Sequence, residues 1–292
     1  MTSRFPNLFL IGAMKAGTSS FYADISRHPE IFFPEKKEPN GLHGIAQGDQ
    51  AASRAYADLY AGRQEIYLGD ASTGYSKFPM LPCPAEAASV QREEIRVLYM
   101  LRDPIRRIER HIAHHIGNGE TRSSALDVFE NPEYAFVSAY EMQLSLWKKW
   151  VPREHIMVFD LKEYKENRNE LIARVFDFLD LPVLDLASLD GMNINRGFSR
   201  RSAYRSRLRF LIHSQAYGVV REYIPRSWRR ALAYGLLPPA NPPDVNLNKS
   251  EVAFLCEAIQ ALDNLDAPGE AEAIATFELV RARHIASAGT MP

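Results

Sequence analysis

The chain has 292 residues, 46% of them hydrophobic, and a formal net charge of -1 at pH 7. These values fit a globular protein with a sizeable core and argue against a general polyanion binder, so any basic site must be local. The two cysteines, Cys83 and Cys256, lie far apart in sequence and indicate neither a disulfide framework nor a metal-ligand pattern. No apolar stretch approaches the roughly 20 residues that span a bilayer. Gly12 and Lys15 interrupt the short N-terminal apolar run, so we expect neither a transmembrane segment nor a signal peptide.

The first predicted elements are a strand, a turn and a helix. Residues 8–11 are apolar and predict a buried parallel strand that stops at Gly12, and Phe21, Tyr22 and Ile25 share one face of the helix that follows. The first amides of a helix have no intrahelical acceptor and lie at the positive end of its dipole. The turn before them carries residues suited to an anion: Lys15, Ala16, Gly17, Thr18, Ser19 and Ser20. This stretch predicts an anion site, with a turn that binds nothing as the alternative.

The position of the lysine separates this turn from the phosphate loop of nucleoside triphosphatases. That loop has the pattern G-x-x-x-x-G-K-[ST], in which the lysine follows the second glycine. Gly12 and Gly17 keep the spacing of the two glycines, but Thr18 occupies the lysine position and Lys15 precedes the second glycine. The turn therefore predicts a phosphate loop of a different kind.

Strands and helices alternate further along the chain. Residues 28–44 are dense in proline, glycine and charge, which predicts a loop over the sheet edge near the anion site. The apolar stretch 95–101 predicts a buried strand that ends at Arg102, and Pro104 suits the first turn of the next helix. Apolar spacing predicts further strands over 66–69 and 156–159, and helices over 51–60, 85–92, 105–116, 134–150, 169–179, 203–212, 226–234 and 247–265.

The alternation predicts an α/β fold of three layers, with helices on both faces of a central parallel sheet. We expect a core over about residues 5–190 and a helical C-terminal extension over about 191–292 of the same domain. Ligands of such folds bind beyond the carboxyl ends of the strands. Lys15 and Arg102 each follow an apolar strand directly, so both are predicted at that edge of the sheet.

Several stretches resemble sulfotransferases that use 3′-phosphoadenosine 5′-phosphosulfate (PAPS). Residues 15–20 resemble their 5′-phosphosulfate loop, K-x-G-T-[TS]-[SA], and residues 102–110 resemble their 3′-phosphate motif, R-[DN]-P-x-x-R-x-x-S. Residues 37–39 resemble the K-E-P segment of the heparan-sulfate-type and bacterial branches, and residues 69–76 resemble their G-[ED]-x-[ST]-P-x-Y segment. With the strand and helix over 156–181, these stretches run in family order over about two-thirds of the chain. The resemblance implies a P-loop-type fold and PAPS as the sulfuryl donor.

The resemblance also implies which residues hold the donor. Residues 15–20 would cradle the 5′-phosphosulfate, and Arg102 would bind the 3′-phosphate, which suits the planar fork of arginine. Arg110 occupies the place of a family serine that binds the same phosphate. Arginine donates more strongly but is bulkier and can instead face solvent, so both roles stay open. Arg196 and Arg201 lie in an arginine-rich span that would correspond to the basic loop closing over the 3′-phosphate end.

Three residues are candidates for the group that activates the acceptor. Glu38 aligns with the catalytic glutamate of the heparan-sulfate-type branch and is the predicted general base. His43 is the rival base, because its pKa lies in the neutral range. Asp70 is predicted to orient the acceptor or to assist as a base, with hydroxyls beside it from Ser72, Thr73 and Tyr75. Ala71 replaces a lysine common in that branch, so an anionic sugar acceptor loses an expected partner.

The resemblance predicts a cytoplasmic, bacterial enzyme that transfers the sulfuryl group to a hydroxyl or amine of a small-molecule, lipid or carbohydrate acceptor. It predicts no nucleic-acid partner, since a loop over the cofactor explains the arginine run. His111, His114 and His115 invite a metal interpretation, because 111 and 115 share a helix face. No third ligand type is near them in sequence and the family needs no metal. We therefore predict no metal site and a solvated or substrate-facing helix.

Two other classes of function remain as alternatives. A nucleotide kinase or other P-loop phosphotransferase needs a lysine after Gly17 and a magnesium-binding carboxylate; the first is absent and the second is not evident. A non-catalytic relative that keeps the nucleotide pocket is suggested by Arg110 and Ala71, the two departures from the family pattern.

Overall fold

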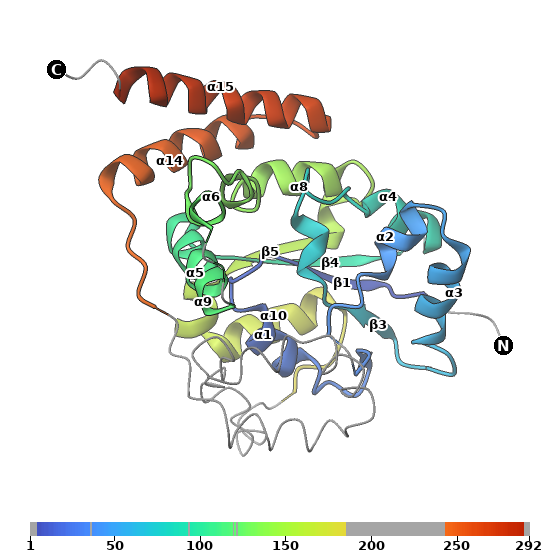
Figure 1. The fold of residues 1–292 in the computed structure, drawn as a ribbon. Coiled ribbons are helices and arrows are strands. Elements are labelled where there is room, and N and C mark those ends of the chain that lie inside the picture. The colour runs from blue at the N-terminus through green and yellow to red at the C-terminus, as the bar shows by residue number, and fades with distance from the viewer. Residues whose placement is uncertain are drawn as a thin grey trace, which may run out of the picture.

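The computed structural model describes residues 5–35, 37–92, 94–118, 120, 122–184 and 243–288. Within these ranges, five strands form one parallel sheet in the order β2-β3-β1-β4-β5 (Figure 1). The strands are β1 (Leu8–Gly12), β2 (Ile31–Phe32), β3 (Tyr67–Asp70), β4 (Arg96–Leu101) and β5 (Ile156–Asp160). The predicted α/β class with a central parallel sheet is confirmed. The predicted helices over 203–212 and 226–234 lie outside the described residues.

The strand order creates a crevice at the carboxyl ends of β1 and β4. After β1 the chain forms the edge strand β2 and then β3 on one side of β1. It then crosses to the other side of β1, where it forms β4 and β5. Such a reversal of direction is the switch point at which open α/β sheets bind ligands, because the loops leave to opposite sides. Phe9 of β1 lies opposite Val97 of β4, and Leu10 lies opposite Leu98, so the loops after these two strands emerge side by side.

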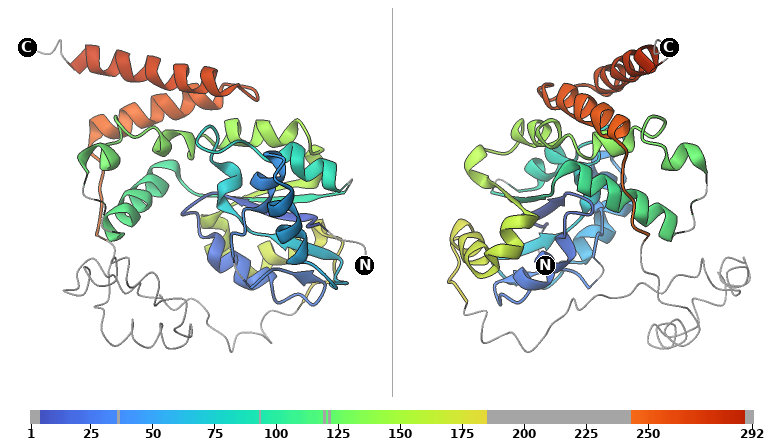
Figure 2. Two further views of the ribbon diagram at one scale, coloured as in Figure 1. Left: turned by 45° about the vertical axis from the view of Figure 1, so that its right-hand side comes forward. Right: turned by 90° about the vertical axis from the view of Figure 1, so that its left-hand side faces the viewer.

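Helices cover both faces of the sheet, as Figures 1 and 2 show. On one face lie α1 (Thr18–Ile25), α9 (Leu161–Glu166) and α10 (Arg168–Phe178), and on the other lie α4 (Ala85–Gln91) and α8 (Tyr140–Lys148). Phe21 of α1 packs on Phe159 of β5 with ring centroids 4.7 Å apart, and Trp147 of α8 packs on Phe9 of β1 at 6.2 Å. The Trp147 indole donates to the Tyr75 carbonyl at 3.1 Å, so its N–H is satisfied in the core.

The segment between α1 and β3 contains more regular structure than its composition predicts. Residues 28–44 were expected to form a loop, but they include β2 and the start of α2 (Gly41–Ala46). Helix α3 (Gln50–Asp58) follows, capped by the Asp49 carboxylate, which accepts from the backbone N–H of Ala51 and Ala52. A two-residue strand cannot be distinguished from a loop by composition, because its pairing with β3 comes from the rest of the sheet.

The single helix predicted over 134–150 is wrong. The structure has two helices, α7 (Glu133–Phe136) and α8, because a buried arginine interrupts the helical hydrogen bonds. Arg107, on helix α5 (Pro104–Gly117), donates to the Tyr134 carbonyl at 2.9 Å and to Ser138 Oγ at 2.7 Å. In a continuous helix the Tyr134 carbonyl would accept from the Ser138 amide, which here donates to Ala135 instead.

The C-terminal helices α14 (Lys249–Asp263) and α15 (Glu270–Ala288) form a pair on the outside of α8 and α7 (Figure 1). Phe254 and Phe277 of this pair share a buried cluster with Ile108 of α5 and Phe136 of α7. The Asp263 carboxylate accepts from the Glu141 and Met142 amides in the first turn of α8, at 2.9 and 3.1 Å, so α14 caps that helix. The helix predicted over 247–265 is confirmed. The patterns missed α9, α15 and the short α6 (Ser123–Leu126). Within the described ranges, no helix combines the length and the apolar character needed to cross a membrane.

A buried carboxylate, paired with a partly exposed arginine, fixes α1 against the helices beside it. Asp24 of α1 accepts two hydrogen bonds from Arg168, at 2.6 and 2.8 Å, and one from the Tyr164 hydroxyl at 2.5 Å. We predict that Asp24→Ala lowers the free energy of unfolding by about 3 kcal/mol, because it leaves a guanidinium and a buried hydroxyl without their acceptor. Equilibrium unfolding in urea measures this difference. The matched variant Asp177→Ala, at an exposed position of α10, should change it by less than about 0.5 kcal/mol, and equal losses in both variants would contradict the assignment.

Candidate functional site

The two predicted cationic strand tips meet at the crevice between β1 and β4. The Arg102 guanidinium donates to the Lys15 carbonyl at 3.1 Å, and the Tyr140 hydroxyl donates to the Arg102 carbonyl at 2.8 Å. Lys15 itself has a φ of 68°, in the left-handed region that side chains other than glycine rarely adopt. Such a conformation persists only where the surroundings hold it in place. The tip of β4 thus helps to fix the backbone of the turn after β1.

The turn after β1 leaves the N-terminus of α1 open to an anion. Gly17 occupies the N-cap position with a φ of 93°, and no side chain in the described part of the chain caps the helix. A Cβ atom at Gly17 would lie 2.7 Å from Leu161 Cδ1, so this close approach requires glycine. The first amides of α1 therefore lack a side-chain acceptor, Thr18 is buried and Ser19 is exposed. Uncapped amides at the positive end of a helix are the features of an anion site.

Sequence reasoning did not place Lys37 at this turn, although it lies in the K-E-P segment. The Lys37 ammonium donates to Ser19 Oγ at 2.9 Å, approaches Thr18 Oγ1 at 3.5 Å and lies 5.9 Å from the centre of the Tyr22 ring. Burial lowers the pKa of Lys37, and the charge of Glu38 partly offsets this. The signal available in the sequence was its position directly before the predicted base.

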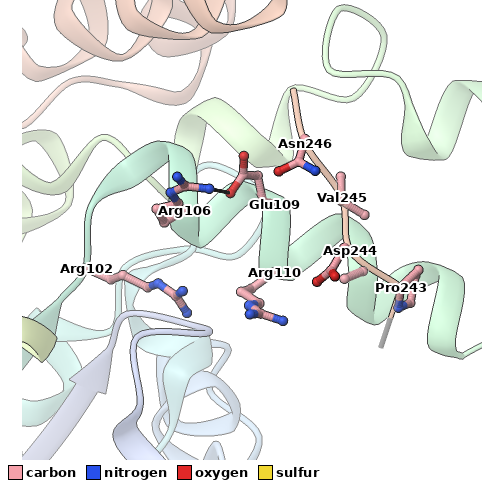
Figure 3. Close-up of a pocket in the computed structure, with 9 residues that line it drawn as sticks. Arg102, Arg106, Glu109, Arg110, Pro243, Asp244, Val245 and Asn246 are labelled. Atoms are coloured by element: carbon pink, nitrogen blue, oxygen red, sulfur yellow. Dashed lines mark hydrogen bonds and ion pairs between the residues drawn. The ribbon is translucent and has the colours of Figure 1, made fainter. Parts of the chain in front are cut away.

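Arginines line a small pocket next to the same strand tips (Figure 3). The pocket has a volume of about 90 Å³, and the side chains of Arg102 and Arg110 point into the same open space. Arg102 follows the end of β4, and Arg110 lies eight residues later on α5. The turns of this helix bring the Arg110 side chain to the same pocket as Arg102. Burial and the charge of Arg110 lower the pKa of Arg102. Two guanidinium groups that repel each other in one pocket favour a bound anion.

The other side of this pocket comes from the segment that leads into α14. Residues 243–246 run along α5, and Asp244 lies beside Arg110 (Figure 3). Arg106, at the pocket edge, pairs with Glu109 at 2.9 Å. Arg196 and Arg201, predicted to close over this end of the ligand, lie outside the described residues.

Glu38 lies within reach of the anion site and is open to the surroundings. Its carboxylate accepts from the Thr73 hydroxyl at 3.3 Å and lies 3.7 Å from the Lys37 ammonium, and its side chain is 42% exposed. The backbone of Glu38 is left-handed, with a φ of 61°. Left-handed backbone thus occurs both in the turn after β1 and at the predicted base, and backbone strain is common at functional sites.

His43 lies below Glu38 in a buried polar position. Both of its ring nitrogens, and Asn40 Oδ1, are buried without a hydrogen-bond partner among the described residues. Burial lowers the pKa of His43, and the nearby Gly74 backbone offsets part of this effect. Asn40 donates its amide protons to the Glu38 carbonyl at 3.0 Å, which links the two candidate bases. Buried polar atoms without partners usually mark a bound molecule or a mobile contact.

The role predicted for Asp70 at the acceptor disagrees with its burial. Asp70 is fully buried and accepts hydrogen bonds from the Tyr56 and Tyr75 hydroxyls and from Ser72 Oγ, at 2.5, 2.6 and 2.5 Å. Burial raises the pKa of Asp70, and these three donors offset the effect in part. The carboxylate has no access to an acceptor, so Asp70 positions the end of β3 instead. Of its predicted neighbours, Ser72 and Tyr75 also point inward, whereas Thr73 contacts Glu38.

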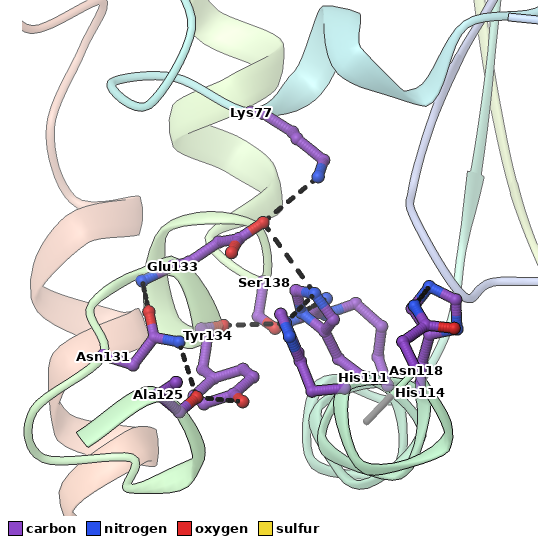
Figure 4. A network of polar contacts seen from close by, with 11 residues as sticks. Lys77, His111, His114, Asn118, Ala125, Asn131, Glu133, Tyr134 and Ser138 are labelled. Atoms are coloured by element: carbon purple, nitrogen blue, oxygen red, sulfur yellow. Dashed lines mark hydrogen bonds and ion pairs between the residues drawn. The ribbon is translucent and has the colours of Figure 1, made fainter. Parts of the chain in front are cut away.

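His111 and His115 of α5 are part of a largely buried network, whereas His114 contacts Asn118 on the outer side of the helix (Figure 4). His111 is 1% exposed, its Nε2 lies 3.1 Å from His115 Nε2, and the Glu133 carboxylate is 3.8 Å away. Lys77 pairs with Glu133 at 3.1 Å. The structure thus supplies the third ligand type that sequence spacing did not, and the ligand atoms of His111, His115 and Glu133 lie within 4.8 Å of one another.

The surroundings of this network nevertheless disfavour a metal ion. Arg107 lies 3.3 Å from His111 Nδ1, and because a guanidinium can only donate, Nδ1 is the acceptor and the ring proton is on Nε2. A metal at Nε2 would move that proton to Nδ1, where it would face another donor, whereas metal-bound histidines normally face an acceptor there. The positive charges of Arg107 and Lys77 also oppose a cation. We interpret the network as a hydrogen-bonded support of α5 and α7.

Comparison with known proteins gives a consistent set of relatives. Carbohydrate sulfotransferase 15 from Rattus norvegicus is 23% identical to the chain over 248 aligned residues, which cover 60% of this chain and 44% of that protein. The protein of the same name from Mus musculus matches to the same extent. The chain therefore spans less than half the length of these curated relatives. No family model matches the chain.

The fold also has a counterpart among solved structures. The crystal structure of a sulfotransferase from Alicyclobacillus acidocaldarius superimposes with a TM-score of 0.54 at 24% sequence identity. The superposition covers 77% of this chain and 99% of that protein. The parallel sheet with helices on both faces is common to the two.

His111 should make the stability of the protein depend on pH. Burial, followed by the charge of Arg107, lowers the pKa of His111 far below its usual range. In the unfolded chain a histidine takes up a proton near pH 6.5. Below that pH the unfolded state therefore binds one more proton than the folded state, and the free energy of unfolding falls as the pH falls.

We predict that His111→Gln, which keeps an acceptor for Arg107, reduces this slope by about 1.4 kcal/mol per pH unit below about pH 6. Urea unfolding at a series of pH values between about 5 and 7 measures the slope. His114→Gln, at the outer side of the same helix, is the control for loss of a histidine as such. The same change of slope in both variants would contradict the prediction.

Proposed function

Because the chain resembles sulfotransferases in its motifs and in its fold, we propose that it transfers a sulfuryl group from PAPS to a hydroxyl or amine of an acceptor. The observation that carries this proposal is the contact between Arg102 and the Lys15 carbonyl, since it puts both cationic strand tips at one crevice. Two phosphate sites on adjacent strand ends suit one nucleotide with phosphates at its 3′ and 5′ positions.

The residues of the crevice fit the donor at both ends. The open N-terminus of α1, with Gly17, Thr18 and Ser19, offers amides and hydroxyls to the phosphosulfate. The pocket with Arg102 and Arg110 offers two guanidinium groups to the 3′-phosphate, and their mutual repulsion would be relieved by that anion. PAPS supplies an activated sulfuryl group on a phosphate leaving group. Lys15 follows the strand that points at this phosphate, so its charge can stabilise the negative charge that develops there.

Glu38 is the proposed general base. Its carboxylate takes the proton of the acceptor hydroxyl while the acceptor oxygen forms a bond to sulfur and the bond from sulfur to the phosphate oxygen breaks. The products are the sulfated acceptor and adenosine 3′,5′-bisphosphate. The contact with Thr73 orients the carboxylate, and its partial exposure gives an acceptor access to it. His43 is the second candidate, since a neutral ring can accept a proton, but its nitrogens are buried.

A carbohydrate is the acceptor class to test first. The names of the rat and mouse relatives describe carbohydrate sulfotransferases. The Glu38 carboxylate, 42% exposed beside the Thr73 hydroxyl, is accessible to a bulky acceptor of this class. Small-molecule and lipid hydroxyls belong in the same panel.

Nucleotide preference separates this proposal from a kinase. We predict that the protein binds adenosine 3′,5′-bisphosphate in preference to ATP with Mg²⁺, and that Arg102→Met weakens the bisphosphate by about 10- to 100-fold through loss of charge-assisted hydrogen bonds. Titration calorimetry measures both affinities. Arg153→Met, on an exposed turn before β5, is the control and should leave the affinity unchanged. Preference for ATP would overturn the proposal.

The assignment of the base has its own test. We expect Glu38→Gln to lower kcat for sulfuryl transfer to a carbohydrate panel by about 10²- to 10⁴-fold, because the neutral amide cannot take the proton. Its affinity for adenosine 3′,5′-bisphosphate should stay that of the wild type. Glu35→Gln, an exposed position on the same segment, is the control. A loss of rate in His43→Gln but not in Glu38→Gln would assign the base to the histidine.

A further inference from the structure

The Lys37 ammonium lies at the positive end of the α1 dipole, where the Glu38 carboxylate 3.7 Å away balances its charge in part. Its ammonium is 2.9 Å from Ser19 Oγ and 3.5 Å from Thr18 Oγ1, at the start of α1, which is the positive end of the helix dipole. Its side chain is 23% exposed, so water screens the charge only in part. A positive charge next to the open amides of α1 stabilises a bound anion. It destabilises the same site when no anion is bound.

The ammonium retains donor capacity in this position. Lys37 has three protons to donate, and the contact with Ser19 at 2.9 Å uses one of them. The contacts with Thr18 at 3.5 Å and with Glu38 at 3.7 Å are both longer than a normal N–H···O hydrogen bond. Because Ser19 accepts from the lysine, its own hydroxyl proton is available to a ligand. Lys37 and Ser19 together therefore offer donors to an anionic oxygen at the start of α1.

Lys37 also spans the distance between the donor site and the base. One ammonium group contacts the hydroxyls of the turn that holds the phosphosulfate and lies next to the Glu38 carboxylate. In an in-line transfer, the group that moves lies between the leaving phosphate and the acceptor that the base deprotonates. The oxygens of that group are the anionic atoms between the two sites.

We propose that Lys37 is a catalytic residue that binds the sulfuryl oxygens of the donor and holds Glu38 beside the acceptor. This role rests on the proposed function and differs from that of Lys15, which acts on the leaving phosphate. Bond changes are those of the transfer itself: the acceptor oxygen bonds to sulfur, the bond from sulfur to the phosphate oxygen breaks, and Glu38 takes the proton. Lys37 keeps its protons throughout and stabilises the oxygens on sulfur by charge and hydrogen bonding.

Adenosine 3′,5′-bisphosphate lacks the sulfuryl group that PAPS carries. Comparing the affinities of the two nucleotides therefore tests contacts with that group without a measurement of activity. We compare Lys37→Met, which keeps the length of the side chain and removes its charge, with Lys15→Met and with Lys165→Met at an exposed position of α9. Calorimetry without acceptor measures the Kd of PAPS and of adenosine 3′,5′-bisphosphate for each protein. Thermal unfolding confirms that each variant is folded.

Lys37→Met should raise the Kd of PAPS about tenfold or more. It should change the Kd of adenosine 3′,5′-bisphosphate by less than about threefold. Its kcat should fall by about 10²-fold, with partial recovery in Lys37→Arg. Lys15→Met should raise the Kd of both nucleotides, and Lys165→Met should change the Kd of neither. Equal weakening of both nucleotides in Lys37→Met would make Lys37 a phosphate ligand and overturn the proposal, as would no change in either. If the wild type binds neither nucleotide or prefers ATP, the proposed function itself fails, and the Lys37 role with it.

Discussion

The hydrogen bond from the Arg102 guanidinium to the Lys15 carbonyl joins the tips of two adjacent strands, and the rest of the site is arranged around it. It brings a cationic side chain from β4 against the left-handed turn after β1, at the switch point of the sheet. The N-terminus of α1, Lys37 and Arg110 lie next to this junction, so positive charge and unpaired donors gather in one crevice. Such an arrangement is suited to binding an anion.

Two buried polar centres hold this crevice in shape without taking part in its chemistry. Asp70 gathers the hydroxyls of Tyr56, Tyr75 and Ser72 under the end of β3. Arg107 binds Tyr134 and Ser138 and divides the helix that the apolar pattern predicts as continuous. Both charged groups are buried and fully engaged, as a buried charge must be if it is to be tolerated. Their positions explain why polar residues that suit a catalytic role in the sequence contribute to architecture instead.

The support of the proposed base differs from that of the proposed donor site. The proposed donor site uses backbone amides and strand ends, which the sheet holds rigidly, whereas Glu38 lies on the segment between β2 and α2 and depends on side-chain contacts with Thr73 and Lys37. The partial exposure of Glu38 leaves this side of the crevice open.

Much of the fold follows from local pattern. The strands β1, β3, β4 and β5, the helices α1, α3, α4, α5, α10 and α14, and the placement of Lys15 and Arg102 at strand ends were predictable, because apolar periodicity and turn residues act within a few positions of the chain. The edge strand β2, the division of α7 from α8, and the helices α9 and α15 were not, because each depends on contacts with distant segments.

The same division holds for the site. The sequence by itself determined which residues carry charge at the strand tips, and the motif spacing determined which phosphate loop the turn resembles. Only the tertiary structure decided that Lys37 reaches Ser19, that Asp70 is buried, and that Glu133 lies beside His111. The physical reason is that a residue type limits the chemistry a position can perform, whereas burial, hydrogen-bond partners and neighbouring charges are properties of the packed chain. These properties determine whether that chemistry is available.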